Sequence, residues 1–343
     1  MEIKRVIISR TDSIGDVVLT LPLAGIIKNH FPNCQILFIG RNYTLPILKD
    51  CKYVDSVINW DEIEKKSNSD KLLYLKTLSA HSIIHVFPKK EIAQLAKKAN
   101  IPIRIGTSHR FYHLFNCNKL VNLGRKNSNL HEAQLNTKLL TPIGINERYN
   151  IDELSSFLKI TPSAKLDSKH RSLLESNTFN LILHPRSKGS AREWGLQNYS
   201  QLISLLPNDK FKIFITGTEE EGLLIRDELI KLNPSVTDLT GKLSLEELLS
   251  FINESDGLIA ASTGPLHIAA ALNIHAIGIY PPIRPMHPGR WAPIGEKTKI
   301  FVKNKKCSLC KNNQKCICIM DIDPESIANY LISISHIRNK EQK

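Results

Sequence analysis

The sequence predicts an α/β protein built from two Rossmann-like, doubly wound domains, and two observations lead to this class. Short runs of Ile, Val and Leu alternate with segments of helical period, which indicates parallel sheets covered by helices on both faces. The alternation stops over residues 143–178 and then resumes, and a length of 343 residues suits two domains.

The first half of the chain, 1–165, is expected to form the first domain. Its predicted strands are the apolar runs at 3–9, 35–40, 55–59, 82–87 and 101–106. Its predicted helices lie near 16–30, 42–50, 70–80, 89–99 and 130–142. The last of these ends in Pro and Gly, as terminated helices do.

The second domain is expected over 178–323, after a polar linker at 143–178 that has room for one short helix. Its predicted strands lie at 180–184, 212–217, 235–239, 257–262 and 275–280. Its predicted helices lie at 197–206, 219–231, 244–253 and 265–272. A final segment, 324–343, is expected to hold a helix over 324–335 that begins at Pro324, a favourable first-turn residue, followed by a tail.

The charge balance favours anionic partners. There are 46 Lys and Arg against 33 Asp and Glu, a net charge of +13. Such a surplus suits a nucleic acid, a phosphorylated substrate or an acidic membrane surface, although an A/T-rich genome that favours Lys codons explains it equally well. Only 6% of residues are aromatic, and the sequence carries no recognised nucleic-acid-binding motif, so we expect no nucleic-acid partner.

We expect a cytoplasmic protein, with peripheral contact to the inner face of the cytoplasmic membrane through basic side chains. The apolar run after the first five residues is too short for a secretory signal. The uncharged stretch 257–283 is long enough to span a bilayer, but its turn residues indicate a strand, a loop, a helix and a strand.

Four of the seven cysteines cluster in CSLCKNNQKCIC, at Cys307, Cys310, Cys316 and Cys318. The C-x-x-C pair suits zinc, but five residues between the two pairs are few for a zinc ribbon. We therefore favour free thiols over a structural metal there, and expect no other metal and no cofactor.

Three segments that follow predicted strands carry candidate chemistry, because ligands of such sheets bind beyond the carboxyl ends of the strands. The first is RTDSIGDVVLT, at 10–20. Gly15 permits a tight turn, and Asp16 lies near a helix start, where the helix dipole favours its ionised form. Asp16 is either a helix N-cap, which contributes about 1 kcal/mol, or a catalytic carboxylate.

The second segment is HPRSKGSAREWG, at 184–195, where cations, a hydroxyl and loop amides suit a diphosphate. The residues concerned are Arg186, Ser187, Lys188, Gly189 and Arg192. An exposed basic loop is the alternative, and Trp194 is expected to hold the loop by packing. The Walker pattern G-x-x-x-x-G-K-[ST] is absent from the sequence, which excludes an NTPase P-loop.

The third segment is AASTGPLHIAAAL, at 260–272. A strand is expected to end at Ser262, Thr263 and Gly264 to turn, and a helix of small residues to follow. The amides and hydroxyls of such a helix start suit an anion. His267, in the first turn, is either a donor to a phosphate or sugar oxygen or a packed side chain.

Two weaker signals lie in GTEEEG, which begins at Gly217, and in GKLSLEELL. Glu221 can accept hydrogen bonds from a ribose diol, although acidic residues also favour helix N-termini for structural reasons. Leu243 can flank a purine ring.

Together these segments resemble the ADP-heptose:lipopolysaccharide heptosyltransferases of glycosyltransferase family nine. The resemblance covers nearly the whole chain and rests on the order and spacing of RTDSIGDVVLTLP, ILHP, REWG, STGPLHIAAAL and IGIYPP. It implies a GT-B fold, in which two Rossmann-like domains face a central cleft. It also implies an acceptor bound by the N-terminal domain, a nucleotide sugar bound by the C-terminal domain, and inversion at the anomeric carbon without a DxD-bound metal.

The resemblance also implies roles for single residues. Asp16 corresponds to the catalytic aspartate, Arg192 to the phosphate-binding cation, Glu221 to the ribose ligand and Leu243 to the neighbour of adenine. The remaining donor-binding residues are expected to be Arg186, Ser187, Lys188, Gly217, Ser262, Thr263, Gly264 and His267. The acceptor-binding residues are expected to be Arg10, Ser13 and Gly15.

Two departures leave the sugar open. Ser262 stands where the family often has Asp, and Arg192 stands where it often has Lys. The function expected is inverting transfer of a sugar, heptose first, from ADP-heptose to an anionic lipopolysaccharide core. The basic residues expected to meet that acceptor are Lys89, Lys90, Lys97, Lys98, Arg104 and Arg110.

Three alternatives remain. The first is a transferase that uses another nucleotide sugar, and the second is a nucleotide-sugar epimerase or hydrolase of similar fold. The third is a binding-only relative, against which the presence of Asp16 and Arg192 argues.

Overall fold

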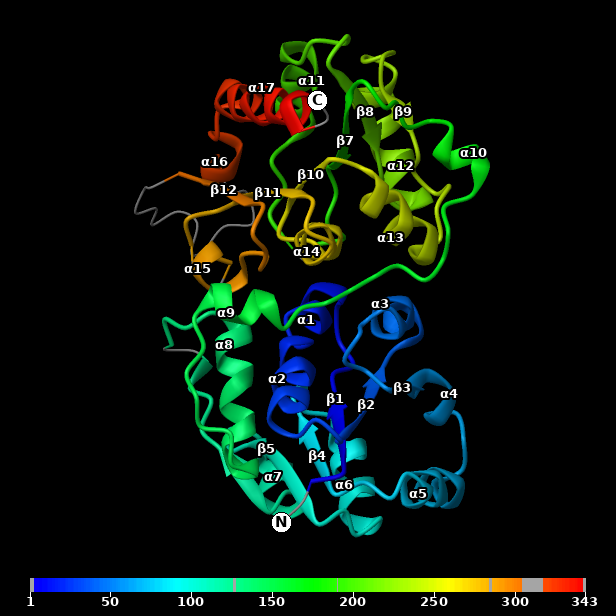
Figure 1. Cartoon of the computed structure of the whole chain (residues 1–343), viewed down its shortest axis with the longest axis vertical. Coiled ribbons are helices and arrows are strands. Elements are labelled where there is room, and N and C mark those ends of the chain that lie inside the picture. The colour runs from blue at the N-terminus through cyan, green and yellow to red at the C-terminus, as the bar shows by residue number, and fades with distance from the viewer. Residues whose placement is uncertain (1–2, 126–127, 190, 284–285, 304–316, 342–343) are drawn as a thin grey trace. The chain divides into compact units, whose positions relative to one another are not determined.

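The computed structural model describes residues 3–125, 128–189, 191–283, 286–303 and 317–341. The chain divides into two compact units, Met1–Thr161 and Pro162–Lys343, and each holds one parallel six-stranded sheet. The predicted α/β class with two doubly wound halves is therefore confirmed (Figure 1).

The first unit has the strand order β3-β2-β1-β4-β5-β6. Its strands are β1 (Arg5–Ser9), β2 (Gln35–Gly40), β3 (Ser56–Asn59), β4 (Ser82–His85), β5 (Ile103–Thr107) and β6 (Lys119–Val121). In register, Val6 of β1 pairs with Ile36 on one side and Ser82 on the other. The chain thus changes direction across the sheet between β1 and β4, and this switch point is where such sheets bind ligands.

Helices join these strands. They are α1 (Ile14–Val18), α2 (Pro22–His30), α3 (Leu45–Lys49), α4 (Trp60–Ile63), α5 (Asn68–Thr77), α6 (Lys90–Lys98), α7 (Phe111–Asn116), α8 (Glu132–Thr137) and α9 (Ile151–Ser156). Short 3₁₀ turns at Asn42–Thr44 and Lys138–Ile143 precede α3 and follow α8. One side of the sheet packs Ile7, Ile39 and Ile83 against Trp60 and Leu75 in a buried cluster.

Several expectations for this unit were wrong in detail. The helix expected over 16–30 is two helices, because Pro22 has no backbone N–H to continue the first and instead begins α2. Three elements, α4, β6 and α7, were not predicted. The exposed side chains of β6 interrupt the apolar run that marks a buried strand, and α4 and α7 span four and six residues, too few to establish a helical period.

The second unit has the order β12-β11-β10-β7-β8-β9. Its strands are β7 (Phe179–His184), β8 (Phe211–Ile215), β9 (Thr237–Asp238), β10 (Gly257–Ala261), β11 (His275–Tyr280) and β12 (Thr298–Val302). The switch point lies between β7 and β10, where His184 pairs with Ala260. The loops after these two strands therefore leave the sheet side by side.

The helices of the second unit are α10 (Ser168–Arg171), α11 (Leu196–Leu205), α12 (Glu219–Ile225), α13 (Leu245–Glu254), α14 (Gly264–Ala271), α15 (Pro288–Trp291), α16 (Ile317–Met320) and α17 (Pro324–Glu341). A π-helical turn, Arg226–Ile230, continues α12. The expected linker at 143–178 contains two short helices, α9 and α10, rather than one. The edge strand β12 was not predicted.

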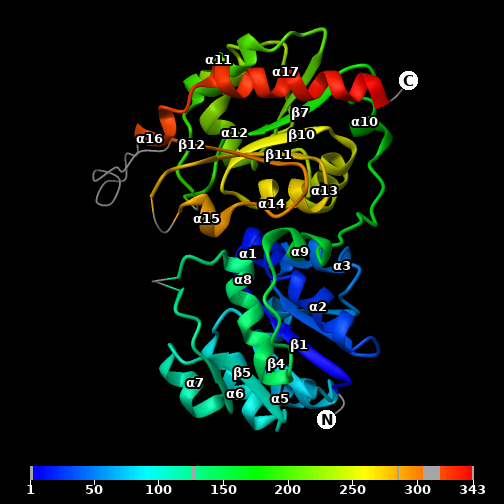
Figure 2. The same ribbon diagram turned by 60° about the vertical axis from the view of Figure 1, so that its left-hand side comes forward.

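The C-terminal helix α17 is part of the second unit. It lies along α11 in both ribbon views (Figure 1, Figure 2). Its side chains Ile327, Ala328 and Leu331 are buried in the same apolar cluster as Leu181 and Leu202. Within the described residues, no helix combines the length and the hydropathy needed to cross a membrane.

Candidate active site

The loop after β1 holds a carboxylate in a fixed position. The Arg10 guanidinium is buried and donates from Nη2 to Asp16 Oδ1, while the Ser13 hydroxyl donates to Asp16 Oδ2. Both carboxylate oxygens of Asp16 therefore have a donor, yet 20% of the side chain remains exposed. A group held in this way keeps its orientation and stays open to a substrate.

Asp16 is not the N-cap of its helix. Ser13 occupies the N-cap of α1, followed by Ile14 and Gly15, so Asp16 is the third helical residue. The N-cap interpretation of Asp16 is wrong. At this position the side chain lies in the first turn, where the unpaired backbone N–H groups favour a negative charge.

Arg10 joins three carboxylates. Its Nε donates to Asp12 Oδ1 at 2.7 Å, and its Nη1 lies 3.7 Å from Oε1 of Glu132, a side chain only 1% exposed. Arg125 Nη2 approaches the same Glu132 oxygen at 3.0 Å. Burial opposes the charge of Arg10, but Asp12, Asp16 and Glu132 outweigh it and raise the pKa of its guanidinium.

Asp12 is the second carboxyl group that Arg10 contacts in this loop. Burial and the nearby charge of Asp16 raise its pKa to about 6, against the opposing attraction of Arg10. Tyr43 donates its hydroxyl to the backbone oxygen of Asp12 at 2.7 Å and so holds the loop. Sequence reasoning missed Asp12, although it stands in the same motif, and missed Glu132 and Arg125, for which the sequence holds no signal.

The loop after β7 is built around Glu193. Its carboxylate pairs with Arg186 Nη1 at 2.8 Å and accepts from the Ser187 backbone N–H at 3.0 Å. Lys188 and Gly189 follow with φ of 48° and 79°, a left-handed turn that exposes both residues. Sequence reasoning missed Glu193, which stands in the REWG motif.

Trp194 anchors this loop, as predicted. Its side chain is fully buried, its Nε1 donates to the Ile322 oxygen at 2.9 Å, and its ring meets Tyr199 edge-on at 5.0 Å. Arg192, two residues earlier and half-buried, is thereby held on the same stretch of chain as Lys188.

The loops after β8 and β9 are joined to each other. The Gly241 N–H donates to the Gly217 oxygen at 2.9 Å, which places the segment before α12 beside the segment that leads to Leu243. Glu221 is buried and accepts from the Thr218 N–H at 2.8 Å, while Thr218 accepts from the Glu221 N–H, so the pair forms a capping box for α12. Leu243 is half-buried. The ribose and adenine roles of Glu221 and Leu243 stay predictions.

The loop after β10 leads into α14. Thr263 is the N-cap without a side-chain capping bond, and among the described residues its buried Oγ1 has no hydrogen-bond partner. Gly264 begins the helix, and His267 in the first turn is buried. Ser262 directly follows β10. Burial raises the pKa of Tyr280, and a side-chain hydrogen bond with Ser262 partly opposes this rise.

His184, the last residue of β7, has a neutral imidazole. Burial lowers the pKa of His184 to about 4, although the charge of Glu221 opposes this, and its Nδ1 lies 3.0 Å from Thr216 Oγ1. Because β7 and β10 are neighbours, Lys188, Arg192 and the first turn of α14 follow adjacent strands of one sheet. Cations and helix N-terminal amides that both lie beyond the carboxyl ends of these strands can bind the phosphates of a nucleotide.

The basic residues expected to meet an anionic acceptor have varied surroundings. Lys89 pairs with Glu64 at 2.6 Å and lies over the Trp60 ring. Arg104 donates from Nε to the Asn116 oxygen at 2.8 Å, a structural contact. Lys97 and Lys98 are exposed in the last turn of α6.

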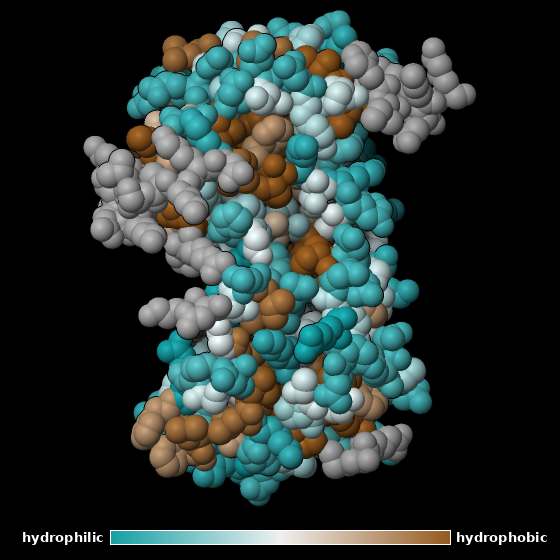
Figure 3. All heavy atoms as spheres, turned by 90° about the vertical axis from the view of Figure 1, so that its left-hand side faces the viewer, coloured by the Kyte–Doolittle hydropathy of each residue, from teal (hydrophilic) through white to brown (hydrophobic). Residues whose placement is uncertain are grey.

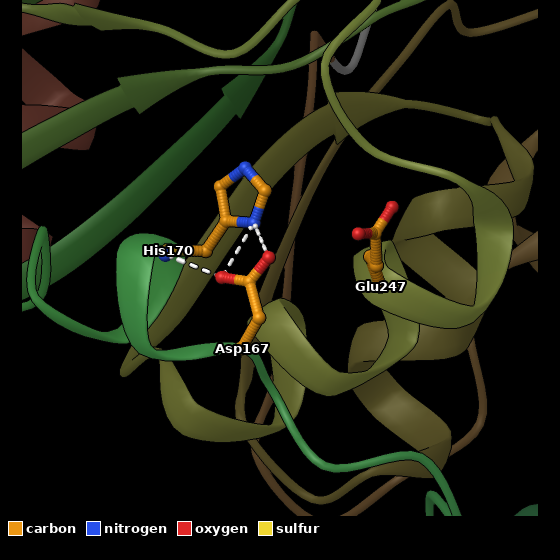
Figure 4. A group of neighbouring side chains, drawn as sticks. All are labelled: Asp167, His170 and Glu247. Atoms are coloured by element: carbon orange, nitrogen blue, oxygen red, sulfur yellow. Dashed lines mark hydrogen bonds and ion pairs between the residues drawn. The ribbon is translucent and has the colours of Figure 1, made fainter.

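Three of the four clustered cysteines, Cys307, Cys310 and Cys316, lie outside the described residues, and Cys318 is buried. The described residues hold one group whose atoms lie close enough together for a metal, Asp167, His170 and Glu247 (Figure 4). Both carboxylates of this group already accept hydrogen bonds that cap helices. Asp167 caps α10 and contacts His170 Nδ1 at 3.0 Å, and Glu247 forms a capping box with Ser244.

The two parallel six-stranded sheets have the architecture of a glycosyltransferase of the GT-B type. A model of glycosyltransferase family 9 (heptosyltransferase) matches residues 88–318, and the chain belongs to this family. Lipopolysaccharide heptosyltransferase 3 of Escherichia coli is 23% identical over 280 residues, which cover 78% of this chain and 80% of that protein. Lipooligosaccharide heptosyltransferase 2 of Campylobacter jejuni is 23% identical over 94% of this chain and 97% of its own length.

Solved structures show the same fold. A family 9 glycosyltransferase from Veillonella parvula superposes with a TM-score of 0.78 at 17% identity, and 98% of each chain is covered. The ADP-heptose heptosyltransferase II of Escherichia coli gives a TM-score of 0.73 at 16% identity, covering 98% of this chain and 99% of that one.

Proposed function

We propose that this glycosyltransferase moves heptose from ADP-heptose to a lipopolysaccharide core acceptor with inversion at the anomeric carbon. The observation that carries the proposal is Asp16, whose two oxygens are held by Arg10 and Ser13 while the side chain stays partly exposed at the switch point. The names of the relatives support the choice of sugar and acceptor, since they include lipopolysaccharide and ADP-heptose heptosyltransferases.

In the proposed reaction Asp16 is the general base. An acceptor hydroxyl attacks the anomeric carbon, its proton passes to Asp16, and the bond from that carbon to the diphosphate oxygen breaks with its electron pair leaving on ADP. The transition state resembles an oxocarbenium ion, as in glycoside chemistry generally. Arg10 and Ser13, which both donate to Asp16, orient its carboxylate for this step.

We assign to residues of the second unit the stabilisation of the negative charge that develops on the leaving diphosphate. Lys188 and Arg192 supply cations, and the first turn of α14 with Thr263 supplies hydrogen-bond donors. Arg186 and Ser187 hold the shape of the loop through Glu193. Glu221 and Leu243, on loops joined by the Gly241–Gly217 hydrogen bond, are proposed to bind the ribose and the adenine.

A different nucleotide sugar is the second candidate, because Ser262 carries no carboxylate to bind sugar hydroxyls. We place the reaction in the cytoplasm, at the inner face of the cytoplasmic membrane, where a lipid-anchored core acceptor resides. The surplus of positive charge supports this location.

The test is ADP release from ADP-heptose with and without a truncated, lipid-free core oligosaccharide. Release that requires the acceptor and is lost in Asp16→Asn supports the proposal, and Asp152→Asn, an exposed carboxylate on α9, serves as the matched control. Release without acceptor would instead indicate a hydrolase. Thermal stabilisation by a UDP- or GDP-sugar, with none by ADP-heptose, would overturn the assignment of ADP-heptose as the donor.

A further inference from the structure

Helix α7 turns an apolar face to solvent. Phe111, Leu114 and Phe115 are 76%, 49% and 60% exposed, and their i, i+3, i+4 spacing places them on one side of the helix. His113, on the other side, is fully buried against the sheet. We call these three exposed side chains the α7 patch. Hydrophobic side chains gather at the edge of the first unit in the space-filling view (Figure 3).

The chain around the α7 patch is cationic throughout. Residues 92–131 contain seven Lys and Arg and no Asp or Glu. Arg110 is exposed and directly precedes Phe111, and Lys97 Nζ donates to the Phe115 oxygen at 2.8 Å. Lys98 and Lys119 are exposed as well. The apolar side chains thus have cations at both ends of the helix.

A second copy of this chain is a poor occupant of such a surface. In a symmetric dimer the same patch would face itself, and the cations around it would meet like charges. An anionic bilayer matches both features, because Phe and Leu side chains reach the boundary of the acyl chains while Lys and Arg contact the phosphates.

We propose that the α7 patch docks this protein on an anionic lipid bilayer, with Phe111, Leu114 and Phe115 inserted at the headgroup boundary and Arg110, Lys98 and Lys119 at the phosphates. The inference rests on the membrane location included in the proposed function and names the surface responsible. It requires no particular donor sugar.

The test is co-sedimentation of the full chain with vesicles of phosphatidylcholine, with and without phosphatidylglycerol. We expect binding to the anionic vesicles that falls as salt rises, and at least about tenfold weaker binding to the neutral ones. Equal binding to both vesicle types, or to neither, would overturn the proposal.

Substitutions separate the apolar part from the cationic part. Phe111→Ser with Phe115→Ser is expected to reduce binding to anionic vesicles at least about tenfold, since burial of each Phe favours the bound state. Lys98→Gln and Lys119→Gln are each expected to reduce it about fivefold. The matched control is Leu223→Ser with Leu224→Ser on α12, where the side chains are 67% and 60% exposed, and it is expected to bind as the parent does.

Activity on the lipid-free core oligosaccharide distinguishes this inference from the proposed function. The variant with Phe111→Ser and Phe115→Ser is expected to keep that activity, which also shows that it folds. Normal transfer with no vesicle binding overturns the docking surface alone, and vesicle binding that follows the patch with no transfer overturns the proposed function alone. A dimer that dissociates on Phe111→Ser with Phe115→Ser would assign the patch to a second copy instead.

Discussion

Replacing Arg10 with lysine tests the carboxylate cluster that the loop after β1 forms. Arg10 uses three nitrogens, Nε, Nη1 and Nη2, toward Asp12, Glu132 and Asp16. A lysine keeps the charge but concentrates it at one atom, so it cannot contact all three carboxylates in these directions. Glu132 keeps Arg125 as a partner at 3.0 Å, and the contacts most at risk are therefore those with Asp12 and Asp16.

The magnitude follows from one lost charge-assisted hydrogen bond. Such a bond contributes about 1.5 to 3 kcal/mol, and the lower half of this range applies because Asp12 and Asp16 are 23% and 20% exposed. If the lost contact orients Asp16 in the transition state, the rate falls about tenfold for each 1.4 kcal/mol. We expect Arg10→Lys to reduce kcat about tenfold and the Tm by about 3 to 6 °C.

The assay is ADP release at saturating donor and acceptor, with a thermal melt of the same sample. Arg41→Lys is the control, because Arg41 also contacts two carboxylates of the first unit, Asp61 and Glu64. It is expected to change kcat less than about twofold, as exposed ion pairs contribute little. An Arg10→Lys protein with the parent rate and Tm would refute the assignment of Arg10 as the residue that positions Asp16.

Four further outcomes are expected. Asp16→Asn should reduce turnover at least about a hundredfold while ADP-heptose still stabilises the protein in a thermal shift, and a near-normal rate would remove Asp16 from the role of base. Arg192→Ala should raise the donor Kd and slow transfer, measured by titration and by ADP release, and an unchanged Kd would contradict a contact with the diphosphate. Glu193→Gln should weaken donor binding by loosening the 186–192 loop, with Glu175→Gln as a control whose donor Kd stays at the parent value. Acid should destabilise the first unit through His85, whose pKa burial lowers to about 3. An ordinary histidine titrates near 6.5, so the stabilising effect of neutral His85 is complete above that pH and is lost as the pH falls below it, by about 2 kcal/mol at pH 5. Asp12 acts in the opposite direction, because its raised pKa of about 6 favours the folded state at low pH. Denaturant titrations of the parent and of His85→Leu at pH 7 and pH 5 isolate the histidine, and equal acid sensitivity of the two would contradict this account.

The strands and helices that the sequence predicted were recognised from apolar runs and helical period, which are local patterns. Eight of the ten apolar runs that predicted strands are largely buried, because a strand inside a parallel sheet must be apolar on both faces. The runs at 55–59 and 235–239 form the edge strands β3 and β9 and are only partly buried. The same pattern fails for β6 and β12, which lie at sheet edges and are only partly buried. It also extended one helix through Leu19 to Leu21, where Pro22 begins another.

The candidate site divides in the same way. Some candidate residues stand in motifs that directly follow strands, namely Asp16, Lys188, Arg192 and Thr263. Their position beyond the carboxyl ends of the strands follows from the parallel topology of the two sheets. Glu193 and Asp12 stand in the same motifs, but their importance depends on which groups they contact. A list of residue types in a loop does not show that one carboxylate organises it.

The sequence by itself determined the α/β class, the two halves, the family and the strand-end loops to which we assign the chemistry, because apolar period and short motifs are local properties of the chain. Only the tertiary structure decided that Arg10 lies between Asp12, Asp16 and Glu132, and that α7 turns Phe111 and Phe115 outward. These features depend on which distant segments the fold packs together, since Glu132 comes from α8 and the buried side of α7 is set by its contact with α6 and β5.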